Sequence, residues 1–176
     1  MKKLQILILA AAMCLLTGCV NRVEDGTELM EAGSYKAAAD EFQAAIDDDK
    51  DVAQAYLGKG ISYFELEAYP AAKQAFNDAI SNGIEETPSL YNMLAICDME
   101  QDNVSEAISS YQEGIALGDD ADGTYAEVIQ EMEYNLVVCY EKQRDWENAK
   151  AKMAEYIAKY PDDADAQKEA EFLETR

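Results

Sequence analysis

A short pattern of side-chain sizes recurs along the chain with a period near 34 residues, and it constrains the fold more than any other feature. A bulky apolar residue is followed three positions on by Ala, and four positions later by another bulky apolar residue. The four copies begin at Tyr35, Tyr69, Val104 and Trp146, so their spacings are 34, 35 and 42 residues. A period of this length indicates stacked repeats that each contain one supersecondary unit.

A second pattern lies upstream of each copy. Tyr56, Gly60 and Tyr63 step by four and then three residues, and the same spacing recurs around Ala95. This spacing places each trio on one face of a helix. Each repeat is therefore expected to be a helix, a tight turn and a second helix, and the small residues let the two helices approach closely.

Together these patterns resemble the tetratricopeptide repeat family, whose first helix carries a bulky–small–bulky pattern and whose second helix carries the aromatic and Ala positions. The resemblance covers nearly all of residues 21–161 and is clearest from Tyr134 to Pro161. It implies an all-α fold, a right-handed α-α superhelix of about four helix-turn-helix repeats plus a C-terminal capping helix. The expected repeats are residues 23–50, 53–84, 88–119 and 124–161, and the expected capping helix is 163–175, with Phe172 and Leu173 packed inward.

Helix-capping residues stand at the expected boundaries. Ser, Thr, Asp and Asn side chains accept hydrogen bonds from the free N–H groups of a helix's first turn, and Pro is favoured at the first helical position. We therefore predict N-caps at Thr87 (followed by Pro88), Asn103, Thr124, Asp145 and Asp163. Asp98 replaces an aromatic residue of the family pattern, which leaves the packing around it open.

Residues 1–18 have the features of an export signal. Lys2 and Lys3 precede the apolar stretch from Leu4 to Leu16, which is too short to span a bilayer as a permanent helix. The following Leu16-Thr17-Gly18-Cys19 resembles a bacterial lipobox. That resemblance implies cleavage before Cys19 and attachment of a diacylglyceryl group to its thiol. An ordinary signal peptide with an incidental Cys is the alternative.

Acylation of Cys19 would anchor the chain to a membrane, because each buried methylene contributes about 0.8 kcal/mol. Residues 19–22 would form a short lipidated tether, and residues 23–176 the repeat domain. We expect a protein of the cell membrane or outer membrane that faces the extracellular side or the periplasm.

The charge balance excludes several classes of function. The chain has 14 basic and 36 acidic residues, a net charge of −22 and no His. It cannot neutralise a run of phosphates, which argues against nucleic acid as a partner. The absence of His removes the commonest general base and transition-metal ligand, and no phosphate loop or nucleophile elbow occurs. We expect a non-catalytic protein with no cofactor.

Acidic clusters and cysteines provide no metal or disulfide site in this interpretation. Aligning Gly123 with the turn glycine of an EF-hand puts Gly118 and Ile129 where Asp and Glu are needed. The clusters are instead expected to be loops and helix caps, and no metal site is predicted. Cys97 and Cys139 occupy equivalent positions in adjacent repeats, too far apart for a disulfide, so both are predicted to be free and buried.

In tetratricopeptide repeat proteins, one stripe of the first helices lines a concave groove in which peptides dock. Here the resemblance assigns to this groove Leu57, Ile61, Phe64, Asn92, Ile96, Met99, Tyr134, Val138 and Glu141. Glu65, Glu100 and Glu131 lie at its edge. An apolar groove with an acidic rim suits a partner with hydrophobic anchors and basic flanks. The alternative is that these side chains bury against one another or the capping helix.

The sequence therefore predicts an exported, lipid-anchored scaffold or adaptor that binds a protein or peptide. A lipoprotein that binds a small ligand or polysaccharide, accessory to a transport or envelope-assembly system, is the alternative from another class. A third possibility is self-association through an exposed repeat face.

Overall fold

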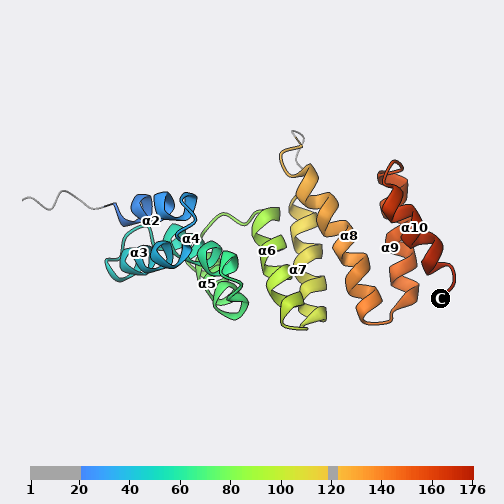
Figure 1. Cartoon of the computed structure of the whole chain (residues 1–176), viewed down its shortest axis with the longest axis horizontal. Helices are drawn as coiled ribbons and strands as arrows, with labels where there is room; N and C mark the ends of the chain where they lie inside the picture. The colour runs from blue at the N-terminus through green and yellow to red at the C-terminus, as the bar shows by residue number, and fades with distance from the viewer. Residues whose placement is uncertain (1–20, 119–122) are drawn as a thin grey trace, which may run out of the picture.

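The computed structural model describes residues 21–118 and 123–176. Within these residues nine α-helices follow one another and no strand occurs. The helices succeed each other along the long axis of the molecule, from α2 to α10 at the C-terminal end (Figure 1). The predicted signal peptide, the predicted lipidation site at Cys19 and the acidic stretch 119–122 lie outside the described residues.

The helices pack as consecutive pairs joined by tight turns, which confirms the predicted all-helical repeat fold. The pairs are α2 with α3, α4 with α5, α6 with α7 and α8 with α9, and α10 packs on α9. Their bounds are α2 Arg22–Glu31, α3 Tyr35–Asp47, α4 Val52–Glu65, α5 Tyr69–Ser81, α6 Pro88–Glu100, α7 Val104–Leu117, α8 Ala126–Lys142, α9 Trp146–Lys159 and α10 Ala164–Leu173.

The small residues of the repeat pattern sit where helices approach closely. The Ala of each second helix is completely buried at Ala38, Ala72, Ala107 and Ala149. A Cβ atom added to Gly60 would lie 2.5 Å from Cδ1 of Phe76, closer than packed atoms allow. The bulky and small positions of the repeat are therefore complementary halves of one helix–helix contact.

The four turns inside the helix pairs share one backbone conformation. Gly33, Glu67, Asp102 and Arg144 have φ values of 72°, 56°, 59° and 58°, in the left-handed region. They recur with the spacing of the repeats. Only the first is Gly, so the other three turns hold a left-handed residue with a Cβ atom, a conformation that is unfavourable by about 1–2 kcal/mol.

Three of the predicted caps are confirmed. The side chain of Thr87 accepts a hydrogen bond from Leu90 N, that of Asp145 from Asn148 N, and that of Asp163 from Asp165 N and Ala166 N.

Asn103 is the N-cap residue of α7, but its side chain makes no capping bond, and Nδ2 instead donates to Asp98 Oδ1 at 3.4 Å. The prediction for Thr124 is wrong. A turn from Gly123 O to Ala126 N places Tyr125, rather than Thr124, at the N-cap of α8.

The prediction that Phe172 packs inward is wrong, whereas Leu173 is buried. Consecutive helical residues differ by about 100° in direction, so α10 can turn only one of the two toward α9. Phe172 remains 42% exposed, and the Arg176 guanidinium lies 4.3 Å from the centre of its ring.

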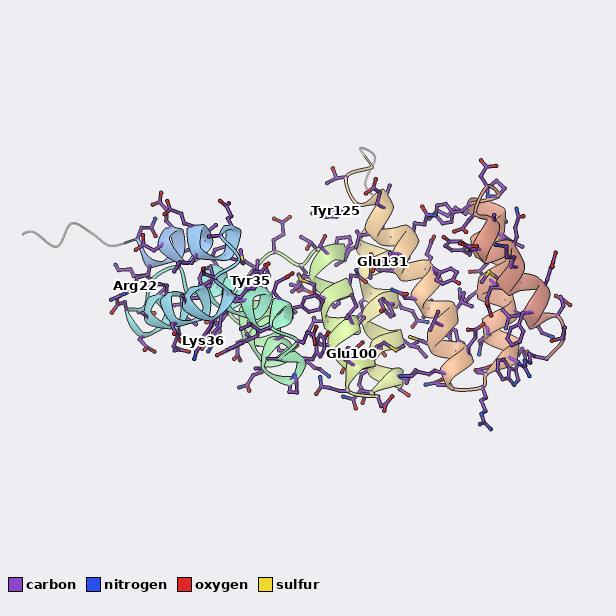
Figure 2. All side chains as sticks on the ribbon, in the orientation of Figure 1. Arg22, Tyr35, Lys36, Glu100, Tyr125 and Glu131 are labelled. Carbon is purple, nitrogen blue, oxygen red and sulfur yellow. The ribbon has the colours of Figure 1, made fainter. Side chains whose placement is uncertain are left out.

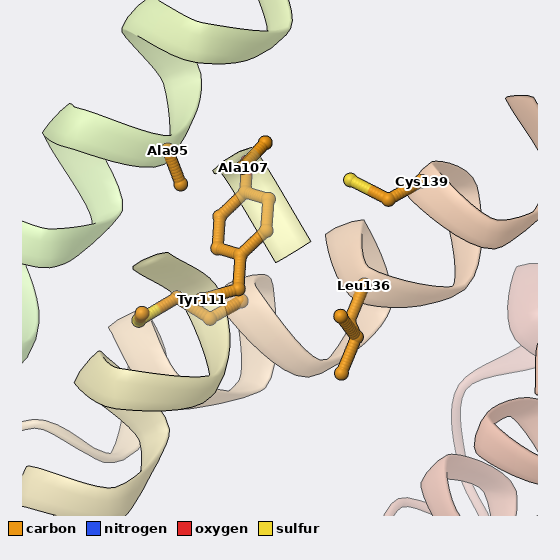
Figure 3. Close-up of a cluster of buried hydrophobic side chains, with 6 residues drawn as sticks. Ala95, Ala107, Tyr111, Leu136 and Cys139 are labelled. Carbon is orange, nitrogen blue, oxygen red and sulfur yellow. The ribbon is translucent and has the colours of Figure 1, made fainter. Parts of the chain in front are cut away.

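Both cysteines of the repeats are free and fully buried, as predicted. Burial raises the pKa of the Cys97 thiol to about 12 and that of the Cys139 thiol to about 11. Cys139 belongs to the core between α6, α7 and α8, which Figure 3 shows with Ala95, Ala107, Tyr111 and Leu136. This core fixes α6 against α8.

One buried ion pair joins neighbouring repeats. The side chain of Asp98 in α6 is 2% exposed and its Oδ1 accepts from Lys73 Nζ in α5. This contact resolves the packing at the position where Asp98 departs from the family pattern.

Across 21–118 and 123–176, no helix is both long enough and apolar enough to cross a membrane.

Candidate functional site

The nine predicted groove residues come from three helices, α4, α6 and α8. Within each helix they are spaced four and then three residues apart, so each trio lies on one face. Glu100 of α6 and Glu131 of α8, which are predicted to lie at the edge of the groove and are labelled in Figure 2, are exposed. The structure divides this stripe into an open part and a packed part.

The open part is an apolar pocket of about 340 Å³ between α4 and α6. Leu57 and Ile61 line it from α4, and Leu90 and Met93 line it from α6. Ile84, from the segment between α5 and α6, completes the apolar lining. Two predicted groove residues therefore face a cavity of the size that accepts a large side chain or small ligand.

The rim of this pocket is polar and negatively charged. Its polar lining residues are Gln54, Glu85, Thr87 and Ser89, with no Lys or Arg among them. The pocket thus combines an apolar interior with an edge that attracts cations.

Three other predicted groove residues pack against neighbouring helices. The Phe64 ring meets Tyr69 of α5 edge to face, with 5.9 Å between ring centres, and Tyr134 meets Tyr156 of α9 at 5.5 Å. Met99 Sδ lies 3.2 Å from Cys139 Sγ. Such contacts stabilise the stack and leave less of these side chains for a partner.

Asn92 is an exception in an otherwise apolar part of the stripe. It is 7% exposed, and its Oδ1 atom is buried without a hydrogen-bond partner. A buried oxygen without a hydrogen bond destabilises the protein, and a donor group that bound there would remove this cost. Ile96 and Val138, which continue the stripe, are half-buried.

Glu141, the last predicted groove residue, lies beside Glu169 of α10. Burial, and then hydrogen bonding and charge repulsion with the Glu169 carboxyl, raise the pKa of Glu141 to about 7. Burial and the nearby carboxylates of Glu169 and Glu141 also raise the pKa of Tyr134. At this end the capping helix covers the stripe, and one of the two acids holds its proton near neutral pH.

The sequence analysis missed part of the pocket lining. Leu90 and Met93 are three residues apart on α6, a spacing that marks a shared face, but they are offset from the stripe around Asn92. Ile84 lies between helices, where no periodicity signals its direction. Among residues 21–118 and 123–176, no group of three or more acids or cysteines is placed to hold a metal ion.

A sequence model of the tetratricopeptide repeat matches residues 24–89 and again 59–123, and a second model of the same repeat matches residues 132–163. The chain belongs to the tetratricopeptide repeat family. Tetratricopeptide repeat proteins are typically non-catalytic binding scaffolds, and no catalytic family matches this member. No curated protein matches the sequence.

Several solved structures have the same fold. YrrB, a TPR protein with an unusual peptide-binding site, superimposes with a TM-score of 0.72 at 21% identity, over 89% of this chain and 76% of YrrB. A structure of MamA gives a TM-score of 0.71 at 17% identity, over 84% of this chain and 81% of MamA. A second structure of MamA gives a TM-score of 0.73 at 16% identity, over 86% of this chain and 78% of MamA. At these identities the likeness establishes the fold alone.

Proposed function

We propose that this tetratricopeptide repeat protein is a non-catalytic scaffold that holds a peptide segment of a partner protein in the pocket between α4 and α6. The observation that carries the proposal is the cavity of about 340 Å³ lined by Leu57, Ile61, Leu90 and Met93. Partner side chains that fill such apolar pockets dominate the affinity of protein interfaces. The fold is also similar to that of YrrB, a TPR protein with a peptide-binding site, which supports a peptide as the ligand.

The charge around the pocket defines the chemistry of the partner. Glu85 lines the rim, Glu65 and Glu100 are exposed on the two flanking helices, and the chain carries a net charge of −22. A segment with an apolar anchor and flanking Lys or Arg residues would be attracted to this surface, and an acidic segment would be repelled. The pocket interior offers few converging polar groups, which favours a peptide over a small polar ligand or a sugar.

Replacing Ile61 by Asp should weaken binding of such a peptide about tenfold or more, because the new charge would enter the apolar pocket. Leu66→Asp is the matched control, since Leu66 is 44% exposed and lies outside the pocket. Fluorescence anisotropy would measure the affinity for peptides that share one Leu or Phe anchor and carry either Lys or Glu flanks. It would give both the effect of each substitution and the preference between the two kinds of flank. Unchanged affinity in a fully helical Ile61→Asp protein, or preference for the Glu-flanked peptide, would refute the proposal.

The proposed place of action is the cell envelope, where acyl chains on Cys19 would anchor the scaffold. The support is the sequence Leu16-Thr17-Gly18-Cys19 directly after the apolar stretch that ends at Leu16. Cys19→Ser should abolish incorporation of labelled palmitate and move the protein from the membrane fraction to the soluble fraction. Cys97→Ser should leave both unchanged. Palmitate on the Cys19→Ser protein would contradict the assignment.

A further inference from the structure

A second pocket, of about 270 Å³, lies between α7, α8 and α9. Ile115 and Ala116 of α7 and Leu136 of α8 provide its apolar surface. Leu136 is two residues from both Tyr134 and Val138, so at about 100° per residue it points to the opposite side of α8 from the predicted groove. This pocket is therefore separate from the site of the proposed function.

The polar residues of the second pocket balance in charge. Lys159 Nζ lies 2.8 Å from Glu133 Oε1, and Lys152 Nζ lies 2.8 Å from Glu155 Oε2. All four residues line the pocket, two cations and two anions. The rim of the α4–α6 pocket, by contrast, carries an acid and no base. The two pockets thus favour different ligands.

The two lysines give this pocket unused hydrogen-bond donors. Lys152 and Lys159 are seven residues apart on α9, which places them about 10 Å apart along the helix axis. Each ammonium group has three N–H donors. Lys152 pairs with Glu155, and Lys159 hydrogen-bonds to Glu133 and Tyr160, so each lysine retains at least one donor. The Lys152–Glu155 pair is exposed and spans three residues of one helix, an arrangement that contributes little and yields readily to a ligand.

Backbone amide groups match this lining best. Their carbonyl oxygens accept from the lysines without adding charge to a chain of net charge −22, and their N–H groups can donate to Glu133 Oε2, which is buried without a hydrogen-bond partner. The cavity is slightly smaller than the clefts of about 300–1,000 Å³ that hold drug-sized ligands, and it suits a single large side chain. Such a side chain flanked by backbone carbonyls is what an extended segment of a protein presents.

We infer that the pocket between α7, α8 and α9 is a second docking site. It takes one aromatic or branched apolar side chain of a partner protein, and the neighbouring backbone carbonyls of that partner accept hydrogen bonds from Lys152 and Lys159. A partner held here needs no basic flanks, so the two pockets allow the scaffold to bind two chemically different segments at once.

N-acetyl-phenylalaninamide, which carries one aromatic ring between two carbonyl groups, is a suitable probe. Titrated into the isotope-labelled full chain, it should shift the backbone amide resonances of Ile115, Ala116 and Leu136. N-acetyl-alaninamide should shift them far less. Ile61→Asp should leave this titration unchanged, so a failure here is distinguishable from a failure of the α4–α6 proposal.

Ala116→Trp tests the location, because Ala116 is exposed and its enlarged side chain would fill the pocket without entering the core. It should weaken probe binding about tenfold or more. Ala37→Trp, at an exposed position of α3, should not.

Three outcomes would overturn the inference. The first is unchanged affinity in the Ala116→Trp protein. The second is tighter binding of phenylpropanoate than of the amide, which would indicate an anionic small ligand. The third is concentration-dependent self-association that Ala116→Trp abolishes, which would assign the pocket to a second copy of the chain.

Discussion

Lys73→Met is expected to destabilise the protein by about 3–5 kcal/mol, the range for buried ion pairs that lose one partner. The variant would leave the carboxylate of Asp98, 2% exposed, with Asn103 Nδ2 at 3.4 Å as its remaining side-chain partner. Small domains have a free energy of unfolding of only about 5–15 kcal/mol, so the loss would be a large fraction of the total. Urea denaturation followed by circular dichroism would measure it.

Two further variants make this test specific. Lys142→Met removes the equivalent chemical group from an exposed pair with Asp102, whose side chain is 88% exposed, and should change the free energy of unfolding by at most about 1 kcal/mol. The double variant Lys73→Met, Asp98→Leu removes both charges and should recover most of the loss. Equal effects of Lys73→Met and Lys142→Met would show that Asp98 is solvated.

The second large effect concerns the carboxyl pair between α8 and α10. The pKa of Glu141 is raised to about 7 from a usual value of 4.5. The folded state therefore binds this proton more tightly than the unfolded state, and stability is full below about pH 4.5 and declines as the pH rises to about 7. Glu141→Gln should be more stable than the wild type at pH 8, by up to about 3 kcal/mol, and nearly equal to it at pH 4.5.

The measurement is the difference in free energy of unfolding between variant and wild type at several pH values. For Glu131→Gln, at an exposed position of the same helix, the difference in free energy of unfolding from the wild type should not rise between pH 4.5 and pH 8. Glu169→Gln should reproduce only part of the effect of Glu141→Gln, because it removes the repulsion between the two carboxylates but leaves the Glu141 carboxyl buried. A constant difference across the pH range would contradict the close pairing of Glu141 with Glu169.

The parts of the fold that sequence predicts correctly are those that depend on neighbours within one helix pair. Ala38 and Phe42 belong to a pattern that only paired helices satisfy, so the sequence predicts the helix pairs. It does not predict the contacts between one repeat and the next. Asp98 was recognisable as a departure, but its partner Lys73 lies on α5 in the preceding repeat, and nothing in the local spacing identifies it.

The candidate site follows the same division. The spacing of Leu57 and Ile61 places them on one face of α4, but whether that face is open depends on how the side chains of α6 fit against it. Glu141 belongs to the equivalent face of α8, yet it is covered because α10 brings Glu169 beside it. The rotation of α10 about its axis, which also leaves Phe172 exposed, cannot be derived from its sequence, because Phe172 and Leu173 are adjacent and both bulky and apolar.

The labelling rates of the two buried sulfhydryl groups would report local unfolding of the repeats. Alkylating reagents attack the deprotonated sulfur. Cys97 is protonated and inaccessible at neutral pH while α4, α5 and α6 stay packed, and Cys139 while α6, α7 and α8 stay packed. The rate at which each becomes labelled therefore reports how often its own helix separates from the stack. Because the two residues lie in successive helix pairs, their relative rates reveal whether neighbouring repeats unravel together or one after the other.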